Sequence, residues 1–178
     1  MKTVRLTNGQ VLLIREAVSQ DAADIIQYLE KIPYDSEFLT FGPGELTRSV
    51  DEEEKMIIES SKAQNKVTLV VEVENMIVGC LNFRGGPRPR NEHTGEFGVS
   101  VLKKYWGQGI GSAMIEEMIE WAKVSTVVRK INLLVRSDNS RAVHIYEKLG
   151  FMREGVISRG VFISGQFYDY IHMGYLIN

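Results

Sequence analysis

Residues 104–112, KYWGQGIGS, carry three glycines at alternate positions between a strand-like pattern and an apolar helical pattern. A glycine-rich lead-in keeps side chains away from the free amides at a helix N-terminus, where the helix dipole also favours negative charge. We therefore expect residues 107–112 to form a backbone seat for a phosphate-like anion, called the anion seat below. A turn that only allows close packing of strand against helix is the alternative interpretation.

The spacing of these glycines disfavours two common nucleotide-binding motifs. The Walker motif needs a lysine and then a serine or threonine after its last glycine, whereas Gly111 is followed directly by Ser112. The dinucleotide motif G-x-G-x-x-G belongs to an opening strand–helix–strand unit, whereas this segment lies mid-chain after a hairpin pattern. A kinase-like, ATPase or Rossmann interpretation is therefore poor.

The rest of the chain alternates between apolar patterns of period two and of period three to four, which are typical of strands and helices. Strands are expected over residues 11–15, 67–73, 76–83, 95–101, 130–135, 161–163 and 167–176, the first paired through an Asn8-Gly9 turn with residues 3–7. Helices are expected from Ser19 to before Pro33, from a Ser49/Glu52 capping box, over 110–123, and over 139–149 with Gly150 as the stop. Residues 33–48 are expected to form a loop, and loops of that length are often functional.

Composition indicates one globular domain over residues 1–178, with 44% hydrophobic and 25% charged residues. A net charge of −2 without a basic run argues against duplex nucleic acid and favours small molecules or basic acceptors as partners. The single cysteine, Cys80, cannot form an internal disulfide and is expected to be a buried, inert thiol in a reducing compartment. Because no apolar run reaches membrane-spanning length, we expect a cytoplasmic protein without membrane association.

A second group of polar residues lies on the helix expected over 139–149. Asn139 and Tyr146 are seven residues apart, about two helical turns, so their side chains project from one face. Alone, an amide at a helix start and a phenol further along are ordinary packing. Their position after the glycine segment makes the pair more informative.

In this order, VSVLKKYWGQGIGS and NSRAVHIYEKLGFMREG resemble the two signature segments of the GNAT superfamily of acyl-CoA-dependent N-acyltransferases. The opening IREA and QDA, the hairpin over 67–83 and the tail GVFISGQFYDYIHMGYLI resemble branches that contain spermidine and ribosomal-protein N-terminal acetyltransferases. The resemblance implies an α/β (α+β) fold with a mixed, mostly antiparallel central sheet flanked by helices. One departure is Lys104, where the family usually has arginine or glutamine before the first glycine.

The resemblance also implies acetyl-CoA as the cosubstrate. Its diphosphate would bind the amides of the anion seat, and its pantetheine arm would lie between strands 99–101 and 131–135, which splay apart in this family. The cofactor-binding residues implied in this way are Val99, Val101, Gly107, Gln108, Gly109, Ile110, Gly111, Ser112, Asn139 and Ala142.

The catalytic groups implied by the resemblance are Tyr146 and Glu96. Tyr146 matches the tyrosine that gives or shares a proton with the departing thiolate, and Glu96 matches a carboxylate that accepts the proton of the amine, usually through water. The backbone N–H near Val101 matches a donor to the thioester carbonyl. His93 and His144 are alternative bases, His172 is expected to be structural, and the scattered histidines give no support to a metal site.

The acceptor stays open among a polyamine, a peptide N-terminus, a free amino acid and an aminoglycoside. Tyr34, Asp35, Glu37 and Phe38 in the expected loop could receive a cationic amine, although solvated loop residues are an equal interpretation. A non-catalytic acyl-CoA-binding or regulatory module is the alternative function, and a domain without a ligand is a third. A homodimer is one assembly that the resemblance implies.

Overall fold

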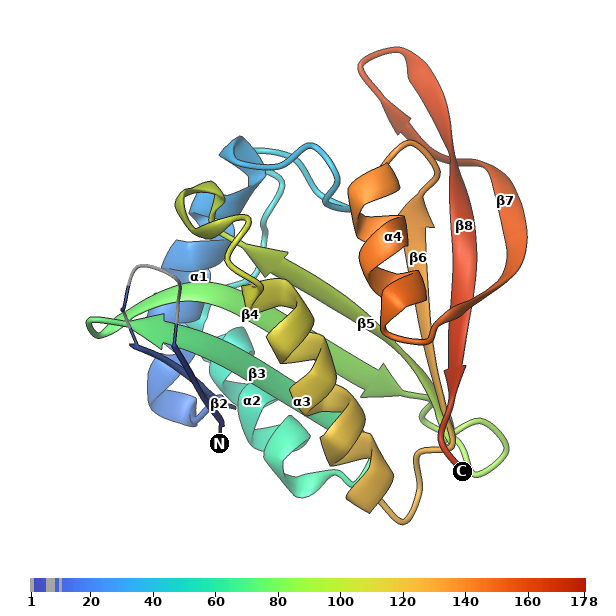
Figure 1. Ribbon diagram of the computed structural model, residues 1–178. Coiled ribbons are helices and arrows are strands. Elements are labelled where there is room, and N and C mark those ends of the chain that lie inside the picture. Colours follow the sequence, from blue (N-terminus) through green and yellow to red (C-terminus); the bar gives the residue numbers. More distant parts are fainter. Residues whose placement is uncertain (1, 6–8, 10) are drawn as a thin grey trace.

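A single eight-stranded sheet, in the order β1-β2-β3-β4-β5-β6-β8-β7, forms the centre of the molecule (Figure 1). The computed structural model describes residues 2–5, 9 and 11–178; Asn8 of the expected turn lies outside them. The strands are β1 (Lys2–Arg5), β2 (Val11–Glu16), β3 (Lys66–Val73), β4 (Met76–Gly85), β5 (Thr94–Val101), β6 (Lys130–Arg136), β7 (Met152–Ile163) and β8 (Gln166–Leu176). The expected mixed, mostly antiparallel sheet is confirmed, because β5 and β6 are the one parallel pair of neighbours among the described strands.

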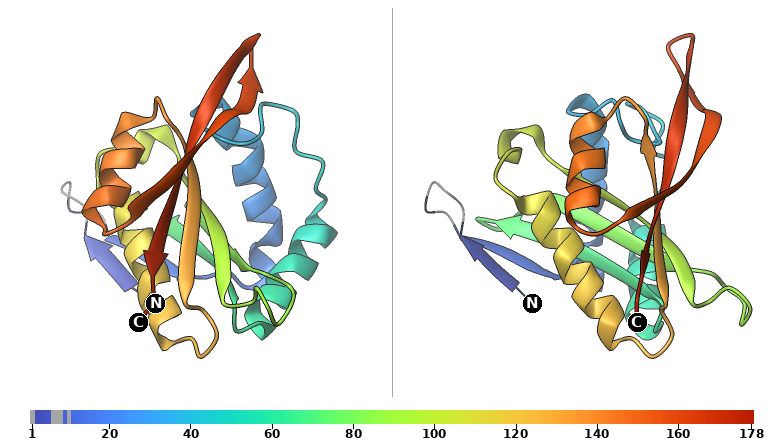
Figure 2. Two further views of the ribbon diagram at one scale, coloured as in Figure 1. Left: turned by 90° about the vertical axis from the view of Figure 1, so that its right-hand side faces the viewer. Right: turned by 45° about the vertical axis from the view of Figure 1, so that its right-hand side comes forward.

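The helices cover both faces of the sheet. They are α1 (Ala22–Lys31), α2 (Val50–Lys62), α3 (Ile110–Val124) and α4 (Ser140–Lys148), with short 3₁₀ turns η1 (Ser19–Asp21), η2 (Ile32–Tyr34) and η3 (Lys103–Tyr105). The left view of Figure 2 shows α1 and α2 on one face and α3 and α4 on the other. Alternation along β3 and β4 divides their side chains accordingly: Leu69 and Leu81 belong to the core under α3, and Val70 and Cys80 to the core under α1 and α2.

The parallel pair β5–β6 is short, and this creates an opening in the sheet. Residues 94–96 of β5 pair with residues 130–132 of β6, after which β5 continues to Val101 and β6 to Arg136 without pairing to each other. Figure 1 shows the two strands meeting at one end and diverging toward α4. The expected splay is thus present, and it leaves two unpaired strand edges facing each other.

Two expected boundaries are wrong. The first helix does not begin at a Ser19 cap: residues 19–21 form a 3₁₀ turn, and the carboxylate of Asp21 accepts from the Val18 N–H (2.8 Å) and binds Arg15 (2.6 Å). The strand expected over 161–163 begins at Met152 instead. β7 lies almost entirely exposed at the sheet edge, and two breaks in its register against β8 remove the alternation that would reveal a strand.

Candidate active site

The anion seat is built where β5 turns through η3 into α3. Gly107 and Gly109 both have φ of +78°, a left-handed conformation that favours glycine, and Gly109 is the N-cap of α3. No side chain of the described residues caps this helix end. A Cβ added at Gly109 or Gly111 would meet no atom within 4 Å, so the first amides of α3 are open to a ligand.

A cavity of about 1090 Å³ connects the anion seat with the opening between β5 and β6. Its walls include most of the residues singled out from the sequence: Glu96, Val99, Val101, Gly107, Gly109, Ile110, Gly111, Ser112, Asn139, Ala142 and Tyr146. Gln108 is the exception, because it does not line the cavity, and its buried side-chain oxygen has no hydrogen-bond partner among the described residues. All predicted site residues except Gln108 therefore line a single cavity.

Tyr146 reaches this cavity from α4. Its ring packs edge-on against Phe97 of β5 and Phe151, with centroids 6.0 Å and 5.9 Å away. Its hydroxyl makes no hydrogen bond to any residue that the structure describes, and burial raises the pKa of Tyr146 to about 12. The phenol is therefore protonated at neutral pH and available to a ligand.

Asn139 holds the start of α4. Its side-chain oxygen accepts a hydrogen bond from the Ala142 N–H at 3.1 Å, which is the N-cap interaction expected from the sequence. The amide nitrogen of Asn139 has no partner among the described residues. Asn139 and Tyr146 both line the cavity, in agreement with their expected position on one helix face.

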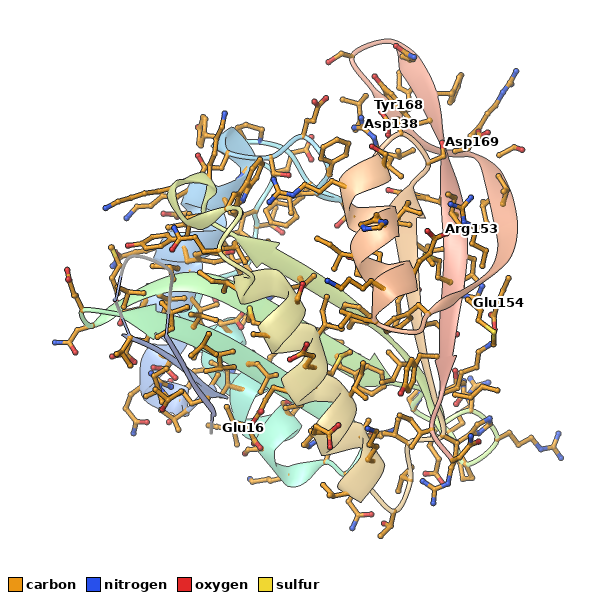
Figure 3. All side chains as sticks on the ribbon, in the orientation of Figure 1. Glu16, Asp138, Arg153, Glu154, Tyr168 and Asp169 are labelled. Atoms are coloured by element: carbon orange, nitrogen blue, oxygen red, sulfur yellow. The ribbon has the colours of Figure 1, made fainter. Side chains whose placement is uncertain are left out.

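Of the candidate bases, Glu96 lines the cavity, whereas His93 and His144 do not. Glu96 is exposed and makes no ion pair within the described part of the chain. His172 lies on β8, where its Nδ1 is 3.2 Å from Glu154, a residue labelled in Figure 3. Glu96 is thus the one of these four groups that is placed to meet a substrate in the cavity.

The loop expected to receive the acceptor contributes differently from the prediction. Phe38 lines the cavity, but Tyr34 is 76% exposed and lies outside its walls. The carboxylate of Asp35 accepts from the Lys103 N–H at 2.8 Å, and the Glu37 carbonyl accepts from Arg136 at 2.9 Å. Asp35 and Glu37 therefore position the loop and do not face the cavity.

Arg136, at the end of β6, joins this loop to the turn before α4 and to β8. Its guanidinium binds both carboxylate oxygens of Asp138, at 2.9 Å and 2.6 Å, and lies between the rings of Phe38 and Tyr168. Figure 3 labels Asp138 and Tyr168 close together at this end of the molecule. The bidentate contact raises the pKa of Arg136 and lowers that of Asp138.

Sequence reasoning missed Arg141 as a candidate cofactor ligand. Its guanidinium lies 5.9 Å from the centroid of the Trp106 ring and about 4.0 Å from the position of a Cβ at Gly107, so it is next to the anion seat. Lys104 points elsewhere: its ammonium lies over the Tyr105 ring, and it does not line the cavity. The sequence signal that could have identified Arg141 is its position as a basic residue in the first turn of the helix that follows Asn139.

None of the helices in the described ranges is long and apolar enough to cross a membrane. The described residues also contain no cluster of three or more His, Cys, Asp or Glu side chains that could hold a metal ion. The expectation of a metal-free site stays a prediction. Cys80 is partly buried in the cavity wall, and burial raises its pKa to about 12, which fits the expected inert thiol.

Residues 29–151 match the model of the Acetyltransferase (GNAT) family. The chain belongs to this family. The GNAT chain is 35% identical to an acetyltransferase of the GNAT family from Streptococcus pneumoniae, with a TM-score of 0.91 over 93% of this chain and 99% of that structure. The family and fold expected from the two signature segments are thereby confirmed.

Two curated relatives bear more specific names. The GNAT chain is 33% identical to the L-amino acid N-acetyltransferase AaaT of Escherichia coli (strain K12) over 105 residues. These residues make up 59% of this chain and 65% of that protein. The GNAT chain is 32% identical over 78 residues to the spermidine N(1)-acetyltransferase of Escherichia coli (strain K12), covering 44% of this chain and 42% of that protein. The GNAT chain thus covers less than two thirds of each of these relatives.

Proposed function

We propose that this protein is a single-domain N-acetyltransferase, residues 1–178, that moves an acetyl group from acetyl-CoA to a primary amine. One observation carries the proposal: the uncapped start of α3 and Tyr146 of α4 line the same cavity. This cavity passes through the opening where β5 and β6 diverge. Membership of the acetyltransferase family agrees with this reaction.

The residues present fit acetyl-CoA. Open amides at Gly109, Ile110 and Gly111 suit a diphosphate, and Arg141 adds a positive charge next to them. The unpaired edges of β5 and β6 offer backbone groups to the amides of a pantetheine arm, in the manner of an added strand. When bound, acetyl-CoA supplies an activated acyl group; the chain itself supplies binding, orientation and proton transfer.

The Tyr146 hydroxyl donates a hydrogen bond to the leaving thiolate and so shares its proton with the sulfur. Its pKa of about 12 exceeds the ordinary value of about 8.5 for a thiol, so a strong hydrogen bond from phenol to thiolate is favoured over complete proton transfer. The phenol stabilises the negative charge that develops on sulfur as the thioester breaks. That role needs a hydroxyl without other hydrogen-bond partners. No described residue bonds the Tyr146 hydroxyl, so this condition is met.

Glu96 receives the proton of the attacking amine, directly or through water. Attack on a thioester requires a neutral amine, and an exposed carboxylate in the cavity wall can draw the proton away. The backbone N–H of Val101 lies five residues along β5 from Glu96, about 16 Å, so it suits the pantetheine arm and not a thioester beside Glu96 and Tyr146. Trp106 fixes this end of β5, because its indole N–H donates to the Val101 carbonyl at 2.6 Å.

The alternative, a non-catalytic acyl-CoA-binding module, shares the anion seat and lacks turnover. The two are separated by measuring release of free CoA thiol with a panel of amines that includes amino acids, spermidine and peptides with a free N-terminus. An enzyme releases CoA only when an accepted amine is present. Acetyl-CoA binding seen by calorimetry, without amine-dependent release for any class, would refute the enzymatic proposal and support the module.

A further inference from the structure

The half of the cavity between the sheet and helices α1 and α2 is lined by three charged side chains without an ion-pair partner in the described ranges, namely Glu45, Arg84 and Glu96. Arg48 is paired with Glu53, and the carboxylate of Glu45 accepts from the Gly42 N–H at 2.7 Å. Arg84 of β4 and Glu96 of β5 are the two of these that lie on the sheet, one of each sign. Both line the same cavity.

Arg84 and Glu96 are directly opposite each other in the antiparallel pair β4–β5. Side chains at opposite positions project from the same face of the sheet, with Cβ atoms about 5 Å apart. That face is the one covered by α1 and α2, since Tyr28 of α1 bonds Ser100 further along β5 and Arg84 reaches Met56 of α2. The Arg84 cation and the Glu96 anion thus lie side by side in the cavity wall without forming an ion pair.

The guanidinium of Arg84 is held in place by the sheet. Its Nε–H donates to the side-chain oxygen of Asn82 at 2.8 Å, and the amide nitrogen of Asn82 donates to the buried Thr68 hydroxyl at 2.8 Å. One terminal nitrogen lies 3.8 Å from the Met56 sulfur, a weak contact, and the other makes no hydrogen bond to a described residue. The terminal nitrogens of Arg84 are therefore available to a ligand.

The surroundings of Arg84 favour an anion. Burial and the nearby charge of Arg48 lower the pKa of Arg84, and the opposite influence of Glu53 and Glu59 is smaller. Neither of those carboxylates lies within 4.0 Å of Arg84 as an ion pair. Arg84 is exposed at its terminal nitrogens, and a bound carboxylate would form charge-assisted hydrogen bonds to a guanidinium whose Nε–H is already bonded to Asn82.

We propose that the acceptor is a free amino acid, whose carboxylate binds Arg84 while its amine lies beside Glu96. This proposal rests on the proposed acetyltransferase function and names the substrate class of the same site. A single carbon separates the amine and carboxylate of an α-amino acid, which suits two opposite charges that project from paired positions on neighbouring strands. A polyamine has no group for Arg84 and would bring a second positive charge next to it.

The test compares carboxylate and carboxamide acceptors in the wild type and in Arg84→Gln. Each L-amino acid that releases CoA is paired with its own carboxamide, and kcat and KM are measured for both in both proteins. We expect Arg84→Gln to lower kcat/KM for the amino acid by about tenfold to a hundredfold, mainly through KM, because a hydrogen bond to a charged group is lost. For the carboxamide, the same substitution should change kcat/KM by less than about threefold.

Two further variants control for folding and for charge. Arg90→Gln removes an exposed arginine in the loop before β5, outside the cavity, and should leave both acceptors unaffected. Arg84→Lys keeps the charge without the planar fork and should give an intermediate loss for amino acids only. Binding of the amino acid itself is followed by calorimetry in the presence of CoA, where Arg84→Gln should weaken it by the same factor as KM.

The outcomes distinguish this inference from the function on which it rests. Equal losses for amino acid and carboxamide, or faster turnover of spermidine than of any amino acid, would overturn carboxylate recognition by Arg84 while leaving the acetyltransferase intact. Absence of CoA release with every amine would instead remove the acetyltransferase proposal. A selective loss for carboxylate acceptors supports both.

Discussion

The ring of Tyr146 meets the ring of Phe97 edge-on, with centroids 6.0 Å apart and an angle of 80° between the planes. Phe97 is the first residue of β5 beyond its pairing with β6, so the contact fastens α4 to β5 where the two strands separate. The Tyr146 ring is thereby fixed by packing, and its hydroxyl is left free. Packing and chemistry at this position can therefore be changed separately.

Replacing Tyr146 with phenylalanine should remove the proton donor and keep the packing. We expect kcat to fall by about a hundredfold or more, as is typical for loss of a general acid, with little change in KM for acetyl-CoA. The ring contacts with Phe97 and Phe151 are retained, so the melting temperature should stay close to that of the wild type. Steady-state CoA release measures the effect, and an undiminished kcat in the variant would exclude Tyr146 as proton donor.

The same pair of proteins should differ in stability at alkaline pH. Since burial raises the pKa of Tyr146 to about 12, the folded protein holds the phenolic proton more tightly than the unfolded chain, in which the pKa is about 10. The resulting stabilisation is complete below pH 10 or so and is lost as the pH rises toward about 12. Between these values, the free energy of unfolding should fall in the wild type relative to Tyr146→Phe by up to about 1.4 kcal/mol per pH unit.

Urea unfolding of both proteins at a series of pH values checks this difference. Tyr28 and Cys80, whose pKa values burial also raises, titrate in both proteins and so do not affect the comparison. Parallel curves above pH 10 would mean that the Tyr146 phenol is well solvated. The Tyr146 hydroxyl would then not be the buried, pre-organised hydrogen-bond donor that the proposed function requires.

The sequence predicted those elements whose local pattern agrees with their final environment. Strands β3 and β4 are apolar over most of their length because both faces of each are covered, and Glu74-Asn75 turns between them with positive φ at both residues. The Ser49/Glu52 capping box is present, with the Ser49 N–H donating to the Glu52 carboxylate at 2.8 Å. β7 could not be predicted in full, because an exposed edge strand with two register breaks has no buried face to impose a period.

The site was predictable where the backbone makes it and much less so where distant side chains do. The glycines that line the anion seat follow one another in the sequence, so their spacing alone indicated the seat. Arg84 and Glu96 become neighbours only through the register of β4 against β5, and Arg136 meets Phe38 only through tertiary packing. Sequence spacing carries no information on contacts of that kind.

Arg141 should contribute more to acetyl-CoA binding than Lys104 does. Arg141 lines the cavity beside Gly107, whereas the Lys104 ammonium lies 5.5 Å from the centroid of the Tyr105 ring and outside the cavity walls. Arg141→Gln is expected to weaken CoA binding about tenfold, with a reduced salt dependence, and Lys104→Gln less than about threefold. Calorimetric titration with CoA at two salt concentrations measures both; the reverse ranking would reassign the diphosphate cation to Lys104.

Gly111→Ala should separate stability from cofactor affinity. Gly111 is in the first turn of α3 without a positive φ, and an added Cβ meets nothing within 4 Å, so alanine should stabilise the fold by up to about 1 kcal/mol. The same methyl group would project toward a diphosphate on the anion seat and weaken CoA binding by about tenfold or more. Gly155→Ala, with equally open space on β7, is the matched control and should bind CoA normally. Unchanged CoA affinity in Gly111→Ala would place the diphosphate away from these amides.

Arg136→Lys should loosen the loop over the cavity. The Arg136 side chain is 3% exposed, and its fork binds Asp138 and the Glu37 carbonyl at once, which the single ammonium of lysine cannot reproduce. We expect a loss of about 1–3 kcal/mol in unfolding free energy, faster hydrogen exchange over residues 35–41, and a larger rise in KM for the acceptor than for acetyl-CoA.

The control for this change is Arg153→Lys, at an exposed ion pair with Glu147, where arginine and lysine should be nearly equivalent. Arg153 is labelled in Figure 3, on the far side of α4 from the loop. Because Asp138 owes its lowered pKa to Arg136, the stabilising contribution of this pair is present near neutral pH and is lost as the pH falls through the folded pKa of Asp138. The difference in stability between wild type and Arg136→Lys should therefore shrink in acid, and a difference that persisted unchanged would mean that ring stacking, and not the ion pair, secures the loop.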